Sequence, residues 1–304
     1  MKRLGVLGTF VWDRIWTLED AARGEPFQSW GGIAYSLASA AATRPAGWEV
    51  VPVVKVGRDL EAEAREFLAA LPGVAAGPSL AVVPEETNRV ELRYTDSAHR
   101  GERLTGGVPG WTWPELEPHV AGLDALYVNF ISGFEMDLAD AEALRRSFGG
   151  PLYADLHSLF LGCPGAGTRR PRTLPEWERW AACFDTVQLN DREMGSLGGA
   201  GEWPERAARV LDAGPRLVLV TLGAAGAAYA RRGAIGSPPE TGTVPPPASS
   251  TGDPTGAGDV WGAAMVSGLL EGMELEPAIR RAHSVAARKM ELRGAAGLYA
   301  HLAG

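Results

Sequence analysis

The sequence predicts an α/β protein built on a mostly parallel central sheet. Between residues 111 and 222, short apolar runs that suit strands alternate with helical stretches, an alternation typical of a parallel sheet covered by helices on both faces. Further strand candidates lie at 3–8 and 50–57, and a glycine-rich loop at 251–262 runs directly into an apolar helix. Because no internal repeat or long linker divides the chain, we expect a single domain over residues 1–304.

The individual elements follow from apolar periodicity and from helix and turn signals. After the first strand, which we expect to end at a turn around Gly8, alternation at 87–96 suits a strand of a half-solvated sheet. The remaining expected strands are 125–131, 152–155, 186–189, 217–221 and 227–230. The expected helices are 58–71, 114–121, 138–147, 175–182, 204–213 and 275–293, together with an apolar helix from Val260 to the stop signal at Gly272.

Composition narrows the class of protein. The 304-residue chain is 45% hydrophobic and 22% charged, with a formal net charge of −8, which is typical of a soluble globular protein and argues against a general binder of nucleic acid or anionic membranes. No apolar run approaches the roughly 18 residues of a membrane-spanning helix, and the N-terminus lacks a signal-peptide pattern. Cys163 and Cys183 do not form a disulfide framework or a zinc motif. We therefore expect a cytoplasmic location.

The lysines exclude one large class of nucleotide-binding proteins. They occur only at Lys2, Lys55 and Lys289, and none is followed by Ser or Thr, so the P-loop motif GxxxxGK[ST] is absent. Backbone amides and arginines would have to hold the phosphates of any nucleotide. A dehydrogenase is a weaker interpretation, because no GxGxxG fingerprint follows the first strand.

The loop at 251–262 predicts an anion site. Gly256, Ala257 and Gly258 stand where the first amides of the following helix lack an intrahelical partner, and a helix N-terminus favours a bound anion such as phosphate. Asp259 follows in the first turn. It either stabilises the helix electrostatically, by roughly 0.3–1 kcal/mol, or acts as the base that removes a proton from a hydroxyl attacking phosphorus.

The segment Asp253-x-Thr-Gly-Ala-Gly-Asp259, followed by an apolar helix, resembles the C-terminal signature of the ribokinase-like (PfkB) carbohydrate kinases. The resemblance implies a three-layer ribokinase-like fold with a small β lid, whose strands would be inserted at about 10–30 and 84–106 and which is often shared across a homodimer. It assigns the anion hole to Gly256–Gly258 and the catalytic base to Asp259. It also implies ATP and Mg²⁺ as cofactors, and K⁺ as a further cofactor at Asp253.

On the substrate side, the resemblance extends to the N-terminal half. Asp13 falls where these kinases have an aspartate that binds sugar hydroxyls, although an aspartate after a strand is commonly a turn or cap residue. Gly31 and Gly32 match the family's substrate-contacting glycine pair, and Ser36 stands where many members have asparagine. His157 replaces an asparagine in a strand-end motif, and it either contacts substrate or is an ordinary loop residue.

On the nucleotide side, Asn190 and Glu193 have the spacing of a helix-capping box. The resemblance implies that this pair organises phosphate and Mg²⁺, with Glu193 acting on the metal through ordered water. Thr221, Gly223 and Gly226 describe a tight hairpin that lines the nucleotide site in the family.

A further nucleotide contact is expected from Ala286, which belongs to the last long helix and would form one wall of an adenine slot or merely allow close packing of that helix. The leading hypothesis is an ATP-dependent kinase acting on a hydroxyl of a sugar or sugar-like small molecule. A nucleoside kinase on the same fold and a non-catalytic sugar-binding or regulatory homologue remain alternatives.

Overall fold

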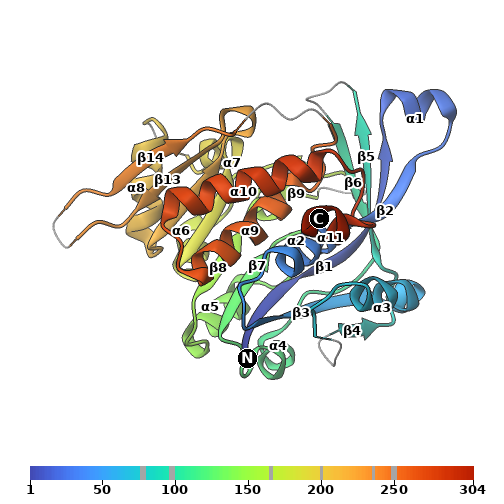
Figure 1. Cartoon of the computed structure of the whole chain (residues 1–304), viewed down its shortest axis with the longest axis horizontal. Coiled ribbons are helices and arrows are strands. Elements are labelled where there is room, and N and C mark those ends of the chain that lie inside the picture. Colours follow the sequence, from blue (N-terminus) through green and yellow to red (C-terminus); the bar gives the residue numbers. More distant parts are fainter. Residues whose placement is uncertain (76–79, 96–99, 164–166, 199–200, 235–236, 248–251) are drawn as a thin grey trace.

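A central sheet separates two layers of helices in this protein (Figure 1). The computed structural model describes all residues except 76–79, 96–99, 164–166, 199–200, 235–236 and 248–251. The strands of the main sheet are β1 (Lys2–Trp16), β3 (Trp48–Gly57), β4 (Leu80–Val83), β7 (Ala125–Asn129), β8 (Leu152–Asp155), β11 (Thr186–Asn190), β12 (Leu217–Thr221), β13 (Ala227–Arg231) and β14 (Glu240–Val244).

The order of these strands is β14-β13-β12-β11-β8-β7-β1-β3-β4. Strands β4 to β12 in this order pair in parallel, and β13 and β14 add an antiparallel edge. The predicted fold class, α/β with a mostly parallel sheet, is confirmed.

Helices cover both faces of the sheet. One layer packs on a core that includes Val6 and Tyr127, and contains α2 (Ile33–Thr43), α3 (Glu61–Ala69), α9 (Ala257–Glu271), α10 (Leu275–Met290) and α11 (Leu298–Ala303). The other packs on a core that includes Leu7 and Val128, and contains α4 (Trp113–Val120), α5 (Leu138–Ser147), α6 (Trp177–Ala182), α7 (Asp191–Ser196) and α8 (Trp203–Ala213). Because Val6 and Leu7 are neighbours in one strand, they point to opposite faces.

A smaller sheet extends from one end of β1. The second half of β1 pairs with β2 (Phe27–Gly32) antiparallel and with β5 (Asn88–Tyr94) parallel, and β6 (Arg100–Thr105) pairs with β5. Helix α1 (Leu18–Arg23) lies between β1 and β2 along the chain, and Figure 1 shows it at the outer end of this extension. A separate two-stranded ribbon joins β9 (Leu161–Gly162) and β10 (Arg170–Pro171).

The first strand departs from the sequence prediction. We expected it to end at a turn around Gly8, but β1 continues to Trp16, so Asp13 lies inside a strand. Gly8 is needed for packing, because a Cβ there would lie 2.5 Å from the Ile33 side chain of α2. The continuation of β1 is stabilised by pairing with β2 and β5, which local periodicity does not reveal.

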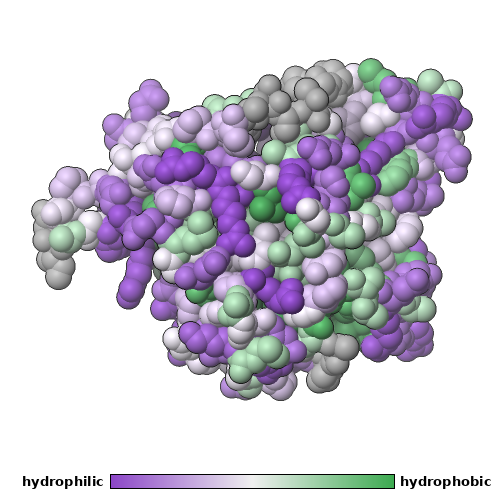
Figure 2. All heavy atoms as spheres, viewed as in Figure 1, coloured by the Kyte–Doolittle hydropathy of each residue, from purple (hydrophilic) through white to green (hydrophobic). Residues whose placement is uncertain are grey.

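Hydrophilic side chains are spread over the face seen in Figure 2, with smaller hydrophobic areas between them. In the part of the chain that the structure describes, no helix has both the length and the apolar character needed to cross a membrane.

Candidate active site

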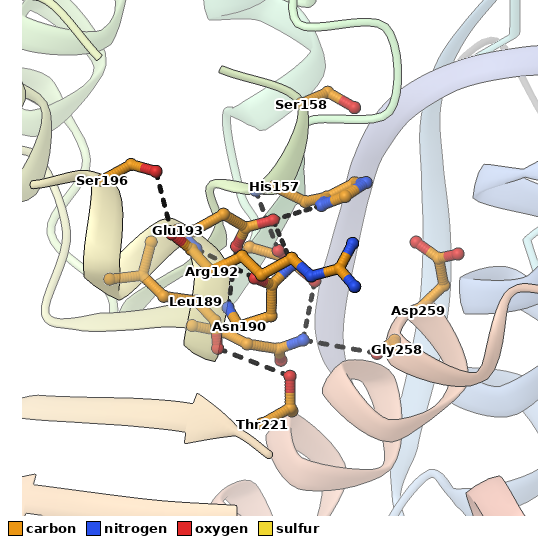
Figure 3. Close-up of polar contacts among 12 residues, drawn as sticks. His157, Ser158, Leu189, Asn190, Arg192, Glu193, Ser196, Thr221, Gly258 and Asp259 are labelled. Carbon is orange, nitrogen blue, oxygen red and sulfur yellow. Dashed lines mark hydrogen bonds and ion pairs between the residues drawn. The ribbon is translucent and has the colours of Figure 1, made fainter. Parts of the chain in front are cut away.

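The predicted site residues gather where the parallel strands end. Strands β7, β8, β11 and β12 finish at Asn129, Asp155, Asn190 and Thr221, and their pairing brings these carboxyl ends to one edge of the sheet. Ligands of open α/β sheets bind at this edge. Helix α9 begins beside it, as Figure 3 shows for Gly258 and Asp259.

The start of α9 depends on an unusual backbone conformation. Gly256, its N-cap, has φ +78°, and a Cβ there would lie 2.4 Å from the Tyr35 ring. Gly258 is exposed, and nothing lies within 4 Å of the place where its Cβ would be. The Ala257 amide donates to Pro254 O at 3.1 Å. The backbone in the first turn of α9 is therefore accessible to a ligand at Gly258, as an anion hole requires.

Asp259 is held by a residue from a distant strand. Asn129 Nδ2 donates to Asp259 Oδ1 at 2.7 Å and to Ser36 Oγ at 2.8 Å. Ser36 Oγ in turn lies 3.4 Å from Asp259 O, to which it donates. The Asp259 side chain is half-buried. Its orientation is thus fixed by β7 and α2 together.

Asp13 and the two predicted glycines form one unit. A Cβ at Gly31 would lie only 1.8 Å from Asp13 Oδ2, so the buried Asp13 carboxylate occupies the space that any other side chain at 31 would need. Gly32 has φ +52° and is the N-cap of α2. Four positions later, α2 supplies Ser36, which connects this unit to Asp259. The glycine pair therefore joins Asp13 to the helix that touches Asp259.

Three aspartate carboxylates of the candidate site lie near the buried Tyr35 side chain and affect its pKa. Burial raises this pKa well above its usual value, and the charges of Asp13, Asp253 and Asp259 raise it further. The carboxylates near the two ends of the chain therefore converge on the same buried ring. Asp13 and Asp259 are far apart in the sequence, and the packing of α2 against the start of α9 brings them close together.

Asn190 and Glu193 form the predicted capping box. Asn190 Oδ1 accepts from the Glu193 amide at 3.0 Å, and Glu193 Oε2 accepts from the Asn190 amide at 2.7 Å. Glu193 Oε1 also contacts Asn190 Nδ2 and His157 Nδ1. Figure 3 shows His157 and Asn190 directed at the Glu193 carboxylate. His157 thus belongs to this group and not to the Asp13 unit.

The charges of this group favour a protonated imidazole. Desolvation alone lowers the pKa of His157, but the Glu193 charge and hydrogen bond and the nearby Asp155 raise it to about 9. Burial and the charge of Glu193 raise the pKa of Asp155 to about 7. Because both Glu193 oxygens already have partners, this carboxylate does not fit direct coordination of Mg²⁺. An outer-sphere contact through water, as predicted, is compatible with the arrangement.

Two adjoining cavities lie beside α9. The larger, about 760 Å³, is lined by polar groups that include His157, Asn190, Arg192 and Glu193. The smaller, about 400 Å³, is lined mainly by apolar and small residues: Gly226, Pro246, Ala257, Gly258, Trp261, Ala286, Ala287 and Met290 are among them. Both are lined by Thr221, Gly223 and Pro254. Every residue predicted for the nucleotide side therefore lines one of these cavities.

The geometry at Asp253 does not fit a monovalent cation. Lys289 Nζ donates to Asp253 O at 2.9 Å and lies 3.7 Å from Asp253 Oδ2, while Asp253 Oδ1 accepts from the Thr255 amide. A second cation at these oxygens would meet the ammonium. Two unit charges about 4 Å apart repel by about 4 kcal/mol at an effective dielectric constant of about 20. In the described residues, no cluster of three or more His, Cys, Asp or Glu suits a metal ion either.

Four residues of the site were missed by the sequence analysis. Asn129 holds Asp259, and Lys289 holds Asp253. Gln188 Nε2 donates to Asp155 Oδ2 at 2.7 Å and to Gly258 O at 3.3 Å, fastening the start of α9 to the sheet. Arg192 extends from α7 toward the side where Asp259 lies (Figure 3). Asn129 and Gln188 had one available signal, because each is a polar residue near the carboxyl end of an apolar strand.

Comparison with known proteins supports this picture. Residues 166–299 match the sequence model of the pfkB family of carbohydrate kinases. Among curated proteins, none matches the chain in sequence. A pyrophosphate-dependent kinase in the ribokinase family superimposes with a TM-score of 0.76 and 21% identity, covering 97% of this chain and 96% of the other.

Two further solved structures are similar over nearly their whole length. A protein of E. coli described as ribokinase II, in complex with ATP and Mg²⁺, gives a TM-score of 0.73 at 17% identity and 99% coverage of both chains. A nucleoside kinase from Burkholderia thailandensis in complex with inosine gives 0.68 at 17% identity, covering 96% of this chain and 92% of the other. The predicted resemblance to ribokinase-like (PfkB) carbohydrate kinases is confirmed over residues 166–299, and the ribokinase-like fold is confirmed over the whole chain.

Proposed function

From the pfkB family match over residues 166–299 and the ribokinase-like fold of the whole chain, we propose that the protein transfers a phosphoryl group from ATP to a hydroxyl of a sugar or sugar-like small molecule. One observation carries the proposal. Asp259 stands in the first turn of α9, next to the open Gly258 backbone, and Asn129 holds its carboxylate at 2.7 Å. A base and an anion hole in one helical turn are what attack on phosphorus requires.

In this proposal Asp259 accepts the proton of the attacking hydroxyl. The hydroxyl oxygen then forms a bond to the terminal phosphorus of ATP as the bond to the leaving ADP oxygen breaks. The helix N-terminus favours both the ionised base and the charge on the transferring group. Asn129 keeps the carboxylate turned toward the site. Asp13, locked over Gly31, is placed to bind other hydroxyls of the acceptor.

The two cavities support a nucleotide as the donor. The larger cavity offers Arg192, Asn190 and His157 to phosphates, and the smaller, mainly apolar one has a volume of about 400 Å³ with Trp261 and Ala286 among its walls. That size and lining suit an adenine base. Inorganic pyrophosphate would leave the apolar cavity unused. We therefore assign ATP as the donor.

Mg²⁺ would enter with the donor phosphates and neutralise part of their charge. Because the Glu193 oxygens are engaged by Asn190 and His157, its role toward a hydrated ion would be through water. The His157 imidazolium beside Glu193 adds positive charge to the same cavity. Its predicted role in substrate binding is therefore assigned to the phosphate side of the site.

The test is an ATP-consumption assay with Mg²⁺ over a panel of sugars, sugar phosphates, cyclitols and nucleosides, with pyrophosphate as an alternative donor. Asp259→Asn should reduce kcat on the accepted substrate at least about 10²-fold, the low end for general-base catalysis. Asp212→Asn, an exposed carboxylate on α8, is the matched control and should behave as the unmodified enzyme. Near-normal turnover by Asp259→Asn would refute the assigned base. Turnover restricted to nucleosides would move the acceptor class to the alternative.

A further inference from the structure

Lys289 is a buried cation next to the proposed anion hole. It lies in the last turn of α10 and is one of only three lysines in the chain, and its side chain is 0% exposed. Nζ donates to Asp253 O at 2.9 Å, lies 3.7 Å from Asp253 Oδ2, and stands 5.2 Å from the centre of the Tyr35 ring. Removing an ammonium from water is costly unless opposite charges and hydrogen bonds compensate for the loss.

The compensation comes from the catalytic region itself. Asp253 Oδ2 is buried, and none of the residues that the structure describes donates a hydrogen bond to it, so the Lys289 ammonium is the charge that balances it. Burial lowers the pKa of Lys289, and the charges of three carboxylates oppose this change; they belong to Asp253, Asp259 and Asp13. The proposed base and the acceptor-binding carboxylate thus both act on this ammonium.

Lys289 also fixes the loop that leads into α9. Asp253 Oδ1 accepts from the Thr255 amide at 2.9 Å, and the Asp253 amide donates to Met290 O at 3.0 Å. The Thr255 hydroxyl, 3.0 Å from the Tyr94 hydroxyl, hydrogen-bonds to it, and Gly256 follows as the helix N-cap. One ammonium therefore orients the peptide segment from which the anion hole is built.

We propose that Lys289 permanently supplies the positive charge behind the anion hole, so that phosphoryl transfer by this protein needs no monovalent cation. This inference rests on the proposed kinase function. It replaces the K⁺ expected at Asp253, whose oxygens are occupied by the lysine and by the Thr255 amide. Lys289 is a positioning residue, since it acts through Asp253 and through its charge on Asp259, and lines neither of the two cavities.

The first experiment uses the unmodified enzyme. Its kcat is measured at constant ionic strength with K⁺, Na⁺ or tetramethylammonium, the last being too large for a buried site. We expect the three values to agree within about twofold, less than 0.5 kcal/mol in the barrier. Activation by K⁺ of about tenfold or more over tetramethylammonium would overturn the proposal.

The second experiment removes the ammonium. Lys289→Ala should lower kcat about tenfold or more, with a smaller change in KM. Added ammonium or methylammonium should restore part of the lost kcat. Lys289→Met fills the space, and should lose kcat without rescue. If Lys289→Met folds and keeps kcat within about twofold of the unmodified enzyme, the lysine is only structural and the proposal is wrong.

A matched control is available in Lys55. This lysine is also buried, but its partners are Gly110 O at 2.7 Å, Glu115 Oε2 at 3.1 Å and the Trp111 ring at 4.5 Å from the ring centre, none of which belongs to the proposed site. Lys55→Ala should lose stability without any recovery of kcat by ammonium. Equal rescue in the Lys55 and Lys289 variants would contradict a specific role for Lys289.

Thermal denaturation separates this inference from the kinase proposal. The melting temperature of the unmodified protein should be the same in K⁺ and tetramethylammonium, whereas that of Lys289→Ala should rise in ammonium. These melting temperatures can be measured even if no acceptor is phosphorylated. In that case the kinase proposal fails, and the cation proposal is tested by the effect of each cation on the melting temperature. A K⁺-specific rise in the unmodified protein would overturn it.

Discussion

Replacing Asn129 with Asp tests whether β7 controls the proposed base. The substitution preserves the shape of the side chain and replaces the amide that donates to Asp259 Oδ1 at 2.7 Å with a carboxylate. Two carboxylates would then share one half-buried site. Such pairs retain a proton, because one of the two pKa values is strongly raised.

The size of the effect follows from the distance. Two unit charges 2.7 Å apart repel by about 6 kcal/mol at an effective dielectric constant of about 20. One pKa unit corresponds to about 1.4 kcal/mol, so even after relaxation the pair should titrate at least about 2 units above an ordinary aspartate. The pair would then keep its proton up to about pH 6 or higher, and a protonated carboxyl cannot accept the proton of the acceptor hydroxyl.

The assay is the pH dependence of kcat for the accepted substrate. We expect the acidic limb of the Asn129→Asp profile to move up by at least about 2 pH units, with activity recovering at alkaline pH. Ser36→Ala is the comparison, since it removes the other acceptor of Asn129 Nδ2 and the bond to Asp259 O but places no second carboxylate beside Asp259, so its acidic limb should not move. An Asn129→Asp profile that coincides with that of the unmodified, equally stable enzyme would refute the role of Asn129.

Two further predictions concern the acceptor side and the anchoring of α1. Gly31→Ala should greatly raise KM for the acceptor, because the new Cβ would lie 1.8 Å from Asp13 Oδ2; an unchanged KM in a folded variant would contradict this. Asp20→Asn should cost about 1.5–3 kcal/mol at pH 7, because Asp20 is buried against Arg293. The hydrogen bond from Arg293 lowers the pKa of Asp20, so this stability is fully present above about pH 4 and is lost progressively as the pH falls toward the lowered pKa of the folded state. Urea denaturation should therefore show a stability difference between the two proteins that shrinks steadily as the pH is lowered below about 4.

Elements whose limits are set by local chemistry could be predicted closely. Strands 152–155 and 217–221 and helix 138–147 appear at the expected residues. Their limits depend on apolar runs and caps within the segment, such as the Asp137 side chain that accepts from the Asp140 amide. The length of β1 could not be predicted in this way, because its continuation depends on pairing with β2 and β5.

The same distinction applies to the candidate site. Asn190 and Glu193 are three residues apart, so their spacing alone predicts the cap that the structure contains. Asn129 is separated from Asp259 by 130 residues, and only the neighbouring positions of β7 and α9 bring them together. Lys289 lies in a helical segment rich in basic residues, where it would be expected to face solvent. Its burial depends on the end of α10 packing against the loop at Asp253.

The capping box shows why a structural explanation of a motif does not exclude a functional one. The cap uses both Glu193 oxygens and one Asn190 oxygen to start α7. By fixing that first turn, it also fixes the direction of Arg192, which extends into the larger cavity (Figure 3). A variant that disrupts the cap should therefore affect donor binding through Arg192 as well as local stability. At this edge of the sheet, the residues that terminate secondary structure are also those that position charged groups for phosphates.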